Sequence, residues 1–309
     1  MSKAFLKLPS FAKINWTLRV LGRRADGFHE LHTIFQTVTL HDVLKFALRE
    51  DEEIRLSCDA PEIPVDESNL IHRAAAALRD RHGIKRGVDI ELEKRIPAAG
   101  GLGGGSSNAA VTLLGLSHLW RIRTNKRQLA EIGARLGADI PFFFTGGTAL
   151  GEGLGTAVTP LREVSAEHLI IITPGVKIAT AEAYKALNAP ALTKVSTDIM
   201  LSISRAGAQF PDSLHSTLHN DFERVVFSLE PEIKRAKSAL ISWGARSALL
   251  AGSGSSVFGI FDNREAQSRA VEALKVEAGW RVFPCATLSR AQYTEALGAC
   301  AATLTAEFP

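Results

Sequence analysis

Apolar and polar residues alternate in the first part of the chain as they do in β-strands. In residues 12–20 the even positions, from Ile14 to Val20, are apolar, so they are expected to share one face of a strand. Lys13 and Asn15 occupy odd positions and are expected to face the other way. The pattern therefore predicts a strand with one apolar face and one polar face, and the polar face can line a cleft.

Helical periodicity begins near residue 68, and strands and helices alternate from there on. Ser68 is placed to cap a helix over residues 68–78. The Ala-rich end, roughly residues 287–309, predicts a helix with a frayed tail, to which the sequence assigns no role. Further strands are expected at 33–38, 42–46, 88–94, 169–174 and 280–283, and further helices at about 109–116, 126–136 and 180–187.

These elements predict a mixed α/β (α+β) protein. A length of 309 residues suggests about two domains, which we place at 1–160 and 161–309. The apolar content of 46% and the charged content of 22% are ordinary for a globular protein with a core. The net charge of +3 is too small and too evenly spread to indicate a nucleic-acid surface.

The sequence also limits location and redox chemistry. Cys58, Cys285 and Cys300 lie far apart, which argues against a disulfide framework and a zinc site. The first ten residues contain no apolar signal region, and no apolar run approaches the length of a membrane span. We expect a cytoplasmic protein that does not bind membranes or nucleic acid, as a monomer or a weak homodimer.

A dense run of glycines follows the strand expected at 88–94 and leads directly into an apolar helix. Glycine allows the backbone to approach a ligand closely, and a helix N-terminus favours an anion. The alternative is a flexible turn, but the hydroxyl groups at the helix start favour phosphate binding. The predicted phosphate-binding residues are Pro97, Gly100, Gly101, Leu102, Gly103, Gly104, Gly105, Ser106, Ser107 and Asn108.

The spelling of this loop excludes the commoner nucleotide-binding motifs. No lysine follows Gly105, so the segment is not a P-loop. The spacing G-x-G-x-x-G of the dinucleotide-binding fingerprint is absent here, and so is the H-R-D landmark of protein kinases.

Three blocks in this order resemble those of the GHMP kinase superfamily, which contains the galactokinases, homoserine kinases and mevalonate kinases. The blocks are Ala-Lys-Ile-Asn at 12–15, the glycine loop at 97–108, and Leu-Leu-Ala-Gly-Ser-Gly-Ser-Ser-Val-Phe-Gly at 249–259. The resemblance implies an N-terminal ribosomal-protein-S5-like domain, a C-terminal ferredoxin-like α/β domain and an active site in the cleft between them.

A further segment, Arg-Ala-Asp-Gly-Phe-His-Glu-Leu at 24–31, is similar to a signature of one branch of that superfamily. Gly-Ala-Asp-Ile-Pro-Phe-Phe at 137–143 and Ser-Asn-Leu at 68–70 agree with the same branch. This resemblance implies an ATP-dependent kinase that phosphorylates the 2-hydroxyl of 4-diphosphocytidyl-2-C-methyl-D-erythritol in the non-mevalonate isoprenoid pathway.

The resemblance also implies roles for single residues. Asp139 is the candidate to accept the proton of the acceptor hydroxyl, and Lys13 is expected beside it. Mg²⁺ is expected to be held mainly by ATP and water, with the Ser106 and Ser107 hydroxyls as candidates for phosphate and metal contact. Unit charges 4 Å apart attract by about 4 kcal/mol at an effective dielectric constant of 20. Taken without the resemblance, Asp139 is a turn residue and Lys13 is a solvated strand lysine.

The remaining site residues are assigned in the same way. Phe28 and Tyr184 are expected to stack on cytosine and His29 to bond its edge, although both rings could instead be packing residues. Asn69 and Lys94 are expected near adenine, with a helix cap and a strand-end charge as the alternatives. Asn15, Gly252, Ser253 and Gly254 complete the expected substrate-binding set.

Three other functions remain open on the sequence alone. Another kinase of the superfamily, of the homoserine or phosphomevalonate type, is disfavoured by the loop at 26–29, since those enzymes hold no cytosine. A non-catalytic sugar sensor would be expected to lack Asp139. A nucleotide-binding module of a larger complex is disfavoured by the complete set of motifs.

Overall fold

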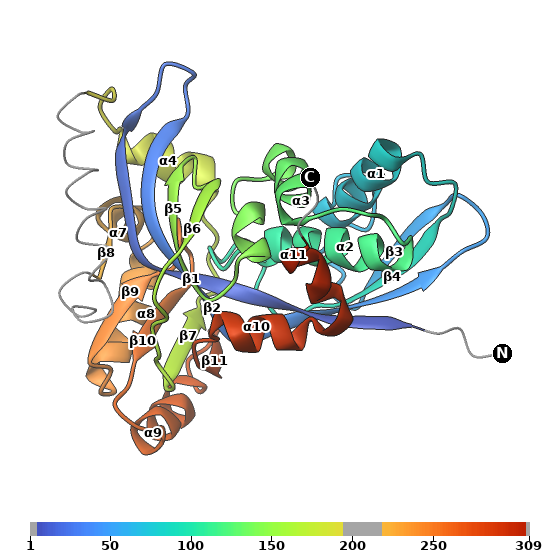
Figure 1. The fold of residues 1–309 in the computed structure, drawn as a ribbon. Helices are drawn as coiled ribbons and strands as arrows, with labels where there is room; N and C mark the ends of the chain where they lie inside the picture. Colours follow the sequence, from blue (N-terminus) through green and yellow to red (C-terminus); the bar gives the residue numbers. More distant parts are fainter. Residues whose placement is uncertain (1–4, 194–217, 307–309) are drawn as a thin grey trace.

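The computed structural model describes residues 5–193 and 218–306, and within them the chain forms two sheets with helices (Figure 1). The strands are β1 Leu6–Arg23, β2 His29–Leu48, β3 Ile54–Cys58, β4 Val88–Glu93, β5 Thr148–Gly153, β6 Ala157–Pro160, β7 Leu169–Thr173, β8 His219–Asn220, β9 Ser247–Leu250, β10 Val257–Ile260 and β11 Arg281–Cys285. The helices are α1 Leu70–His82, α2 Gly104–Leu119, α3 Lys126–Leu136, η1 Ile140–Phe144, α4 Thr180–Leu187, α7 Glu223–Leu229, α8 Pro231–Ser242, α9 Arg264–Leu274, α10 Arg290–Ala296, η3 Gly298–Ala301 and α11 Ala302–Thr305.

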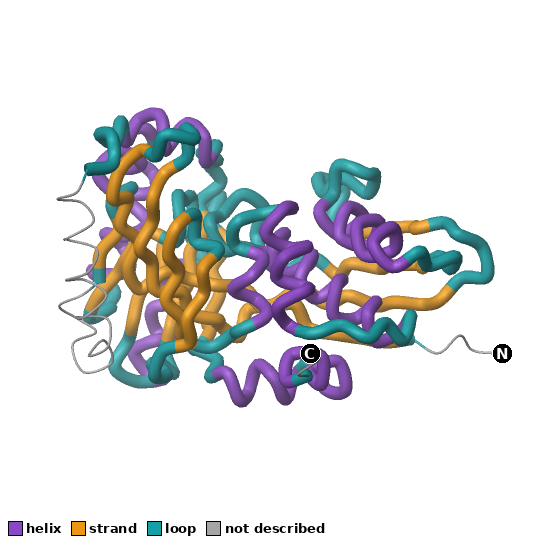
Figure 2. The backbone as a smooth tube through the Cα atoms, turned by 45° about the horizontal axis from the view of Figure 1, so that its top comes forward, coloured by secondary structure: helices purple, strands orange, loops and turns teal. Residues whose placement is uncertain are grey.

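The first sheet is built on the long antiparallel pair β1–β2 and has the order β3-β4-β2-β1-β8. The separate strands expected at 33–38 and 42–46 are one strand of 20 residues, because no turn residue separates them and the pairing with β1 resumes at His41 after a shift of register. β4 pairs with one end of β2, and β5 pairs with its other end. Two long strands thus run through the length of the molecule (Figure 2).

Helices α1, α2 and α3 pack together on the first sheet. Most of α2 is buried, which explains why its sequence is apolar on all sides. The amide of Asn69, not the hydroxyl of Ser68 as expected, caps α1 by accepting a hydrogen bond from the N–H of Ile71. The helix expected at 126–136 is confirmed with the same limits.

The second sheet has the order β11-β7-β10-β9 and is antiparallel throughout. One apolar core packs its strands against α7, α8 and α9. Another core joins the two sheets, and in it the ring of Trp16 in β1 meets the ring of Phe258 in β10 edge-on at 5.6 Å. The expected mixed α/β architecture is confirmed.

The chain passes from the first sheet to the second between β6 and β7. Two later segments return to the first sheet: β8 pairs with β1, and α10 and η3 contribute to the core below α2 and α3. The domain limits of 1–160 and 161–309 stay a prediction. In the part of the chain that the structure describes, no helix is long and apolar enough to cross a membrane.

Candidate active site

The polar face of β1 is interrupted by a change of register. Lys13 and Asn15 line the same cavity, as expected, but the pairing with β2 shifts between Asn15 and Thr17. After a bulge of this kind the alternation of faces restarts. Leu18 therefore lies in the cavity with Lys13, and the expectation that it shares a face with Ile14 and Trp16 is wrong.

Lys13 and Asp139 form the charged pair of the site. The Lys13 ammonium lies 3.4 Å from a carboxylate oxygen of Asp139, and the side chains are 4% and 34% exposed. Asp139 follows the end of α3 and directly precedes η1, which Pro141 helps to start. The lysine is therefore buried and the carboxylate is partly open, so the carboxylate is the member of the pair that an incoming hydroxyl group can reach.

A chain of hydrogen bonds orients this lysine from below. The Lys13 ammonium donates to the amide oxygen of Asn15 at 3.0 Å, and the Asn15 amide nitrogen donates to the Thr33 hydroxyl at 2.7 Å. The Thr33 hydroxyl donates in turn to the carbonyl of Thr17 at 2.7 Å. Thr33 fixes which end of the Asn15 amide faces Lys13. No signal in the sequence indicates this role, because a threonine in a strand is ordinary.

The two glycine loops of the sequence lie backbone against backbone beside Lys13. The N–H of Ser256 donates to the carbonyl of Gly100 at 3.1 Å, and the N–H of Lys13 donates to the carbonyl of Leu102 at 2.9 Å. A Cβ atom on Gly101 would collide with the carbonyl of Ala251, and one on Gly252 would lie 2.8 Å from the carbonyl oxygen of Gly101. Close approach of the loops thus requires glycine on both sides.

The larger of two neighbouring cavities, about 530 Å³, is lined by most of the predicted phosphate loop. Every residue from Pro97 to Ser106 lines it, and so do Asn108, Asn69 and Lys94. Ser107 does not: it is fully buried, and its hydroxyl accepts a hydrogen bond from Ser10 at 2.8 Å. Ser106 and Ser107 were both predicted to bind phosphate, but only Ser106 lines the cavity.

Asp42 is a buried residue that binds two side chains of the cavity wall, those of Lys94 and Asn108, and no motif of the sequence singled it out. Its buried carboxylate accepts hydrogen bonds from the N–H groups of Arg95 and Ile96, both at 2.7 Å. It also binds the Lys94 ammonium at 2.7 Å and the Asn108 amide at 3.1 Å. Burial lowers the pKa of Lys94, and the charge of Asp42 opposes that effect.

The ammonium of Lys94 is therefore committed to Asp42 and to the carbonyl of Ile96. Asn69 is equally occupied, because its amide caps α1 and donates to the carbonyl of Pro64 at 2.6 Å. Both residues still form part of the cavity wall. Their polar atoms are engaged as in the alternatives stated above: Asn69 caps a helix, and Lys94 is a charge at the end of a strand, paired with Asp42.

The smaller cavity, about 240 Å³, lies around the charged pair. It shares Gly101, Gly103 and Thr180 with the larger cavity, so the two are adjacent at the glycine loop. Thr180, the first residue of α4, is a further residue that the sequence did not single out. The rest of the lining is Lys13, Asn15, Leu18, Leu31, Thr33, Phe35, Asp139, Tyr184, Phe222, Gly252 and Ser253. Gly254 is not part of it.

The aromatic residues of the expected base site are brought together only in part. The rings of His29 and Tyr184 stack at 4.7 Å, and Tyr184 meets Phe222 edge-on at 4.8 Å. Phe28 lies at the turn between β1 and β2 and is 61% exposed. Burial, and to a lesser degree Arg23, lowers the pKa of His29; burial raises the pKa of Tyr184, with a smaller effect from Asp139.

The described residues contain no cluster of three or more His, Cys, Asp or Glu side chains that could hold a metal ion. Side-chain oxygen atoms in the walls of the two cavities include the Asp139 carboxylate in the smaller one and the Ser106 hydroxyl in the larger one. This set suits a cation that keeps most of its ligands from water and phosphate, as Mg²⁺ does.

Comparison with known proteins shows the family. The model of the GHMP kinases N terminal domain matches residues 69–147, and that of the GHMP kinases C terminal domain matches residues 203–278. The 4-diphosphocytidyl-2-C-methyl-D-erythritol kinase of Alkaliphilus metalliredigens is 40% identical over 272 residues, which are 88% of this chain and 93% of the relative. That of Pseudomonas savastanoi pv. phaseolicola is 43% identical over 277 residues, 90% of each chain. The chain belongs to the 4-diphosphocytidyl-2-C-methyl-D-erythritol kinase family.

Solved structures agree with this placement in the 4-diphosphocytidyl-2-C-methyl-D-erythritol kinase family. A crystal structure of 4-(cytidine 5'-diphospho)-2C-methyl-D-erythritol kinase matches with a TM-score of 0.74 at 33% identity, over 91% of this chain and 99% of that one. A homoserine kinase from Cytophaga hutchinsonii matches with a TM-score of 0.71 at 20% identity, over 94% and 96% of the two chains. The second likeness concerns the fold alone. The superfamily inferred from the three sequence blocks is confirmed.

Proposed function

We propose that this chain transfers the γ-phosphoryl group of ATP to the 2-hydroxyl of 4-diphosphocytidyl-2-C-methyl-D-erythritol. The observation that carries the proposal is the position of the Lys13–Asp139 pair, beside the glycine loop at which the two cavities adjoin. A phosphate donor in one cavity and an alcohol in the other would meet at this pair. Family membership supports the choice of acceptor.

The larger cavity fits a nucleoside triphosphate. Its glycine loop leads into α2, whose first N–H groups have no partner within the helix and suit an anion. Gly101 and Gly103 have φ angles of +74° and +68°, which side chains rarely adopt, so the loop can keep this shape only with glycine at both positions. Asn69 and Lys94 also line this cavity, and we expect the adenine base beside them.

The chemistry follows from charge and position. Phosphoryl transfer requires alignment and charge stabilisation more than covalent help. Asp139 would accept the proton of the acceptor hydroxyl, and the Lys13 ammonium, oriented by Asn15, would stabilise the charge of the transferring group. Mg²⁺ would be bound mainly by the phosphates and water, with Ser106 as the candidate protein ligand, and would neutralise phosphate charge.

The aromatic residues of β2 and α4 support a cytidine site beside the smaller cavity. Tyr184 lines that cavity and stacks on His29. A cytosine ring would either part this stack or lie on its outer face, where the exposed Phe28 could cover it. Stacking of this kind is worth about 1–3 kcal/mol per base in single-stranded nucleic-acid sites.

The decisive experiment follows ADP release by the purified protein with Mg-ATP and three acceptors in parallel: the cytidylyl methylerythritol, phosphomevalonate and homoserine. We expect turnover with the first alone. Turnover with either of the others would retain the kinase and refute the cytidine site. Binding of ATP without turnover of any acceptor would refute the catalytic proposal and favour a sensor.

A further inference from the structure

The C-terminal segment returns from the second sheet and binds along β2. The N–H of Thr39 donates to the carbonyl of Ala286 at 2.9 Å, and the N–H of Leu288 donates to the carbonyl of Thr37 at 2.9 Å. The Gln36 amide donates to the carbonyl of Leu288 at 2.9 Å. Residues 286–288 thus act as a short added strand beside the centre of β2, directly before α10.

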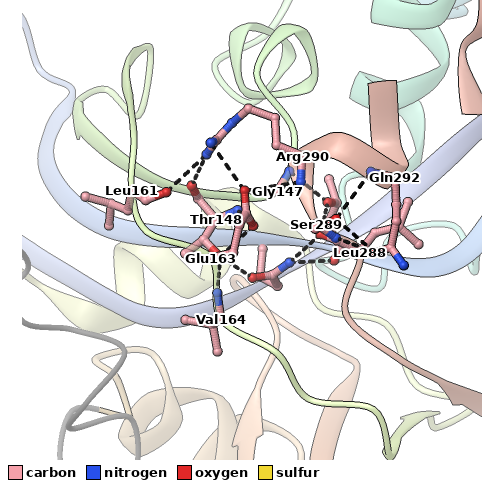
Figure 3. A network of polar contacts seen from close by, with 11 residues as sticks. Gly147, Thr148, Leu161, Glu163, Val164, Leu288, Ser289, Arg290 and Gln292 are labelled. Carbon is pink, nitrogen blue, oxygen red and sulfur yellow. Dashed lines mark hydrogen bonds and ion pairs between the residues drawn. The ribbon is translucent and has the colours of Figure 1, made fainter. Parts of the chain in front are cut away.

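A polar network anchors the start of α10 (Figure 3). The Arg290 guanidinium lies 3.3 Å from the Glu163 carboxylate and donates to the carbonyl of Thr148 at 2.8 Å. The N–H of Arg290 donates to Glu163 at 3.1 Å, and Glu163 also accepts from the N–H of Thr148. Ser289 and Gln292 close a capping box at the same point. The helix is therefore fixed to the strand that follows η1.

Tyr293 extends from this helix into the core next to η1. It is fully buried, and its hydroxyl donates to the carbonyl of Phe143 at 2.6 Å. The last carbonyls of a helix have no partner within it, so this hydroxyl satisfies one that burial would otherwise leave unpaired. Gly146, at φ +63°, leaves room for the tyrosine ring, with which any Cβ atom would collide.

Asp139, the proposed proton acceptor, lies at the start of the same short helix. Asp139 directly precedes η1, and the ring of Phe143 approaches the glycine loop from within η1. A Cβ atom on Gly103 would lie 3.1 Å from that ring and 2.9 Å from the Lys13 side chain. Thus η1 lies against the glycine loop beside Lys13 on one side and is hydrogen-bonded to Tyr293 on the other.

We infer that Tyr293 is a positioning residue for phosphoryl transfer, whose hydroxyl fixes η1 and thereby the Asp139 carboxylate relative to Lys13. This inference rests on the proposed function of Asp139. Tyr293 lines neither cavity, so it should affect the rate of the chemical step rather than binding. A misplacement of about 1 Å can reduce a rate by about a hundredfold.

The test compares Tyr293→Phe, which removes only the hydroxyl, with Ser117→Ala. Ser117 is a matched control because it is buried and its hydroxyl donates to the carbonyl of Leu113 at 2.7 Å, in the second half of α2. For Tyr293→Phe we expect kcat to fall about tenfold or more, with the KM values for ATP and acceptor within twofold of wild type. For Ser117→Ala we expect kcat to stay within twofold, whatever the change in Tm.

A kcat of Tyr293→Phe within twofold of wild type would overturn the inference, and so would an equal loss in Ser117→Ala. Crystal structures of wild type and Tyr293→Phe provide a readout that needs no acceptor: an unchanged Lys13–Asp139 distance also overturns it. Failure of wild type to use the cytidylyl acceptor refutes the proposed function instead. If Tyr293→Phe does not fold, Arg290→Gln replaces it, with a severalfold loss of kcat at constant KM expected and wild-type kcat as the contrary result.

Discussion

Lys13 is a cation with almost no access to water, so its charge must be balanced by groups that the fold supplies. Asp139 supplies a negative charge, and Asn15 supplies a hydrogen-bond acceptor. Because the fold itself positions these three groups, little reorganisation is required when charge develops on the phosphoryl group. At the scale of single residues, the site thus depends on Asp139 and Asn15 to compensate the buried charge of Lys13.

Asp139→Asn tests the proton acceptor directly. The amide keeps the size of the side chain but cannot take a proton, so we expect kcat to fall by about 10²–10⁴, with KM for ATP little changed. Steady-state kinetics on the folded variant check this. Asp80→Asn, in an exposed part of α1, is the control and should retain full activity. A kcat for Asp139→Asn near that of wild type would remove Asp139 from the mechanism.

Tyr184→Leu tests the base site. Loss of one stacking face should raise KM for the cytidylyl acceptor by about five- to 150-fold, since stacking is worth about 1–3 kcal/mol, and should leave KM for ATP unchanged. Phe28→Leu tests the second expected stacking ring, which is 61% exposed. An equal rise in both KM values for Tyr184→Leu would mean that the ring only supports α4.

His32 is a buried histidine whose ring nitrogens have no hydrogen-bond partner among the described residues. Burial lowers its pKa below the ordinary 6.5; Arg19 acts in the same direction, and Glu152 opposes it. The unfolded chain therefore binds the proton first, so stability is lost as the pH falls below about 6.5.

We expect wild type to lose stability between pH 7 and pH 5, which lowers its Tm. The free energy of unfolding of His32→Leu should fall less steeply than that of wild type, by up to about 1.4 kcal/mol per pH unit. Thermal unfolding of both proteins across this range measures the difference. Parallel curves for the two proteins would show that His32 does not titrate in this way.

Elements, unlike single side chains, were largely predictable. The helices at 126–136 and 180–187 appear with the expected limits, because each is amphipathic and ends at a clear signal such as Gly137 or Asn188. The continuity of β2 was not predictable, since the length of this strand depends on partners at both of its ends that are distant in sequence. The bulge after Asn15 was also missed, because no local signal marks it.

The same distinction applies to the site. The glycine loops, Asp139 and Lys13 were accessible through motifs, whereas Thr33, Asp42 and Tyr293 were not. Each of these three acts through contacts with residues far away in sequence. Such contacts exist only once the fold has formed, so a single sequence contains no pattern that announces them.

The first turn of α2 provides a test at this scale. Ser106 lines the cavity, whereas Ser107 lies one residue further along the helix and is bonded to Ser10 in β1. We expect Ser106→Ala to raise KM for ATP with Tm unchanged. Ser107→Ala should lower the stability by about 1–3 kcal/mol, because it leaves the Ser10 hydroxyl buried without a partner, and should have a smaller effect on KM. The reverse pattern would mean that Ser107 faces the nucleotide.

The whole molecule is held together by the core between the two sheets. Trp16 is fully buried there, and its indole N–H donates to Gln36 at 3.3 Å. Because this core includes residues of both sheets, we expect wild type to unfold in one calorimetric transition. Trp16→Ala should lose about 3–5 kcal/mol and separate the unfolding of the two halves into two transitions.

Leu78→Ala is the control for this experiment, because Leu78 is equally buried but belongs to the core of the first sheet alone. It should lower the Tm and retain a single transition. If Trp16→Ala also unfolds in one step, the halves are coupled through other contacts, such as those of the two glycine loops.

The return of the chain to the first sheet, by β8 and again by residues 286–306, has a consequence for anyone who divides the gene. A fragment ending near residue 160 would lack β8, the second partner of β1, and α10, which binds η1 through Tyr293. The complementary fragment would carry both pieces with nothing to bind. Neither product is then a self-sufficient folding unit, and soluble material is expected only when the two fragments are co-expressed and reassemble.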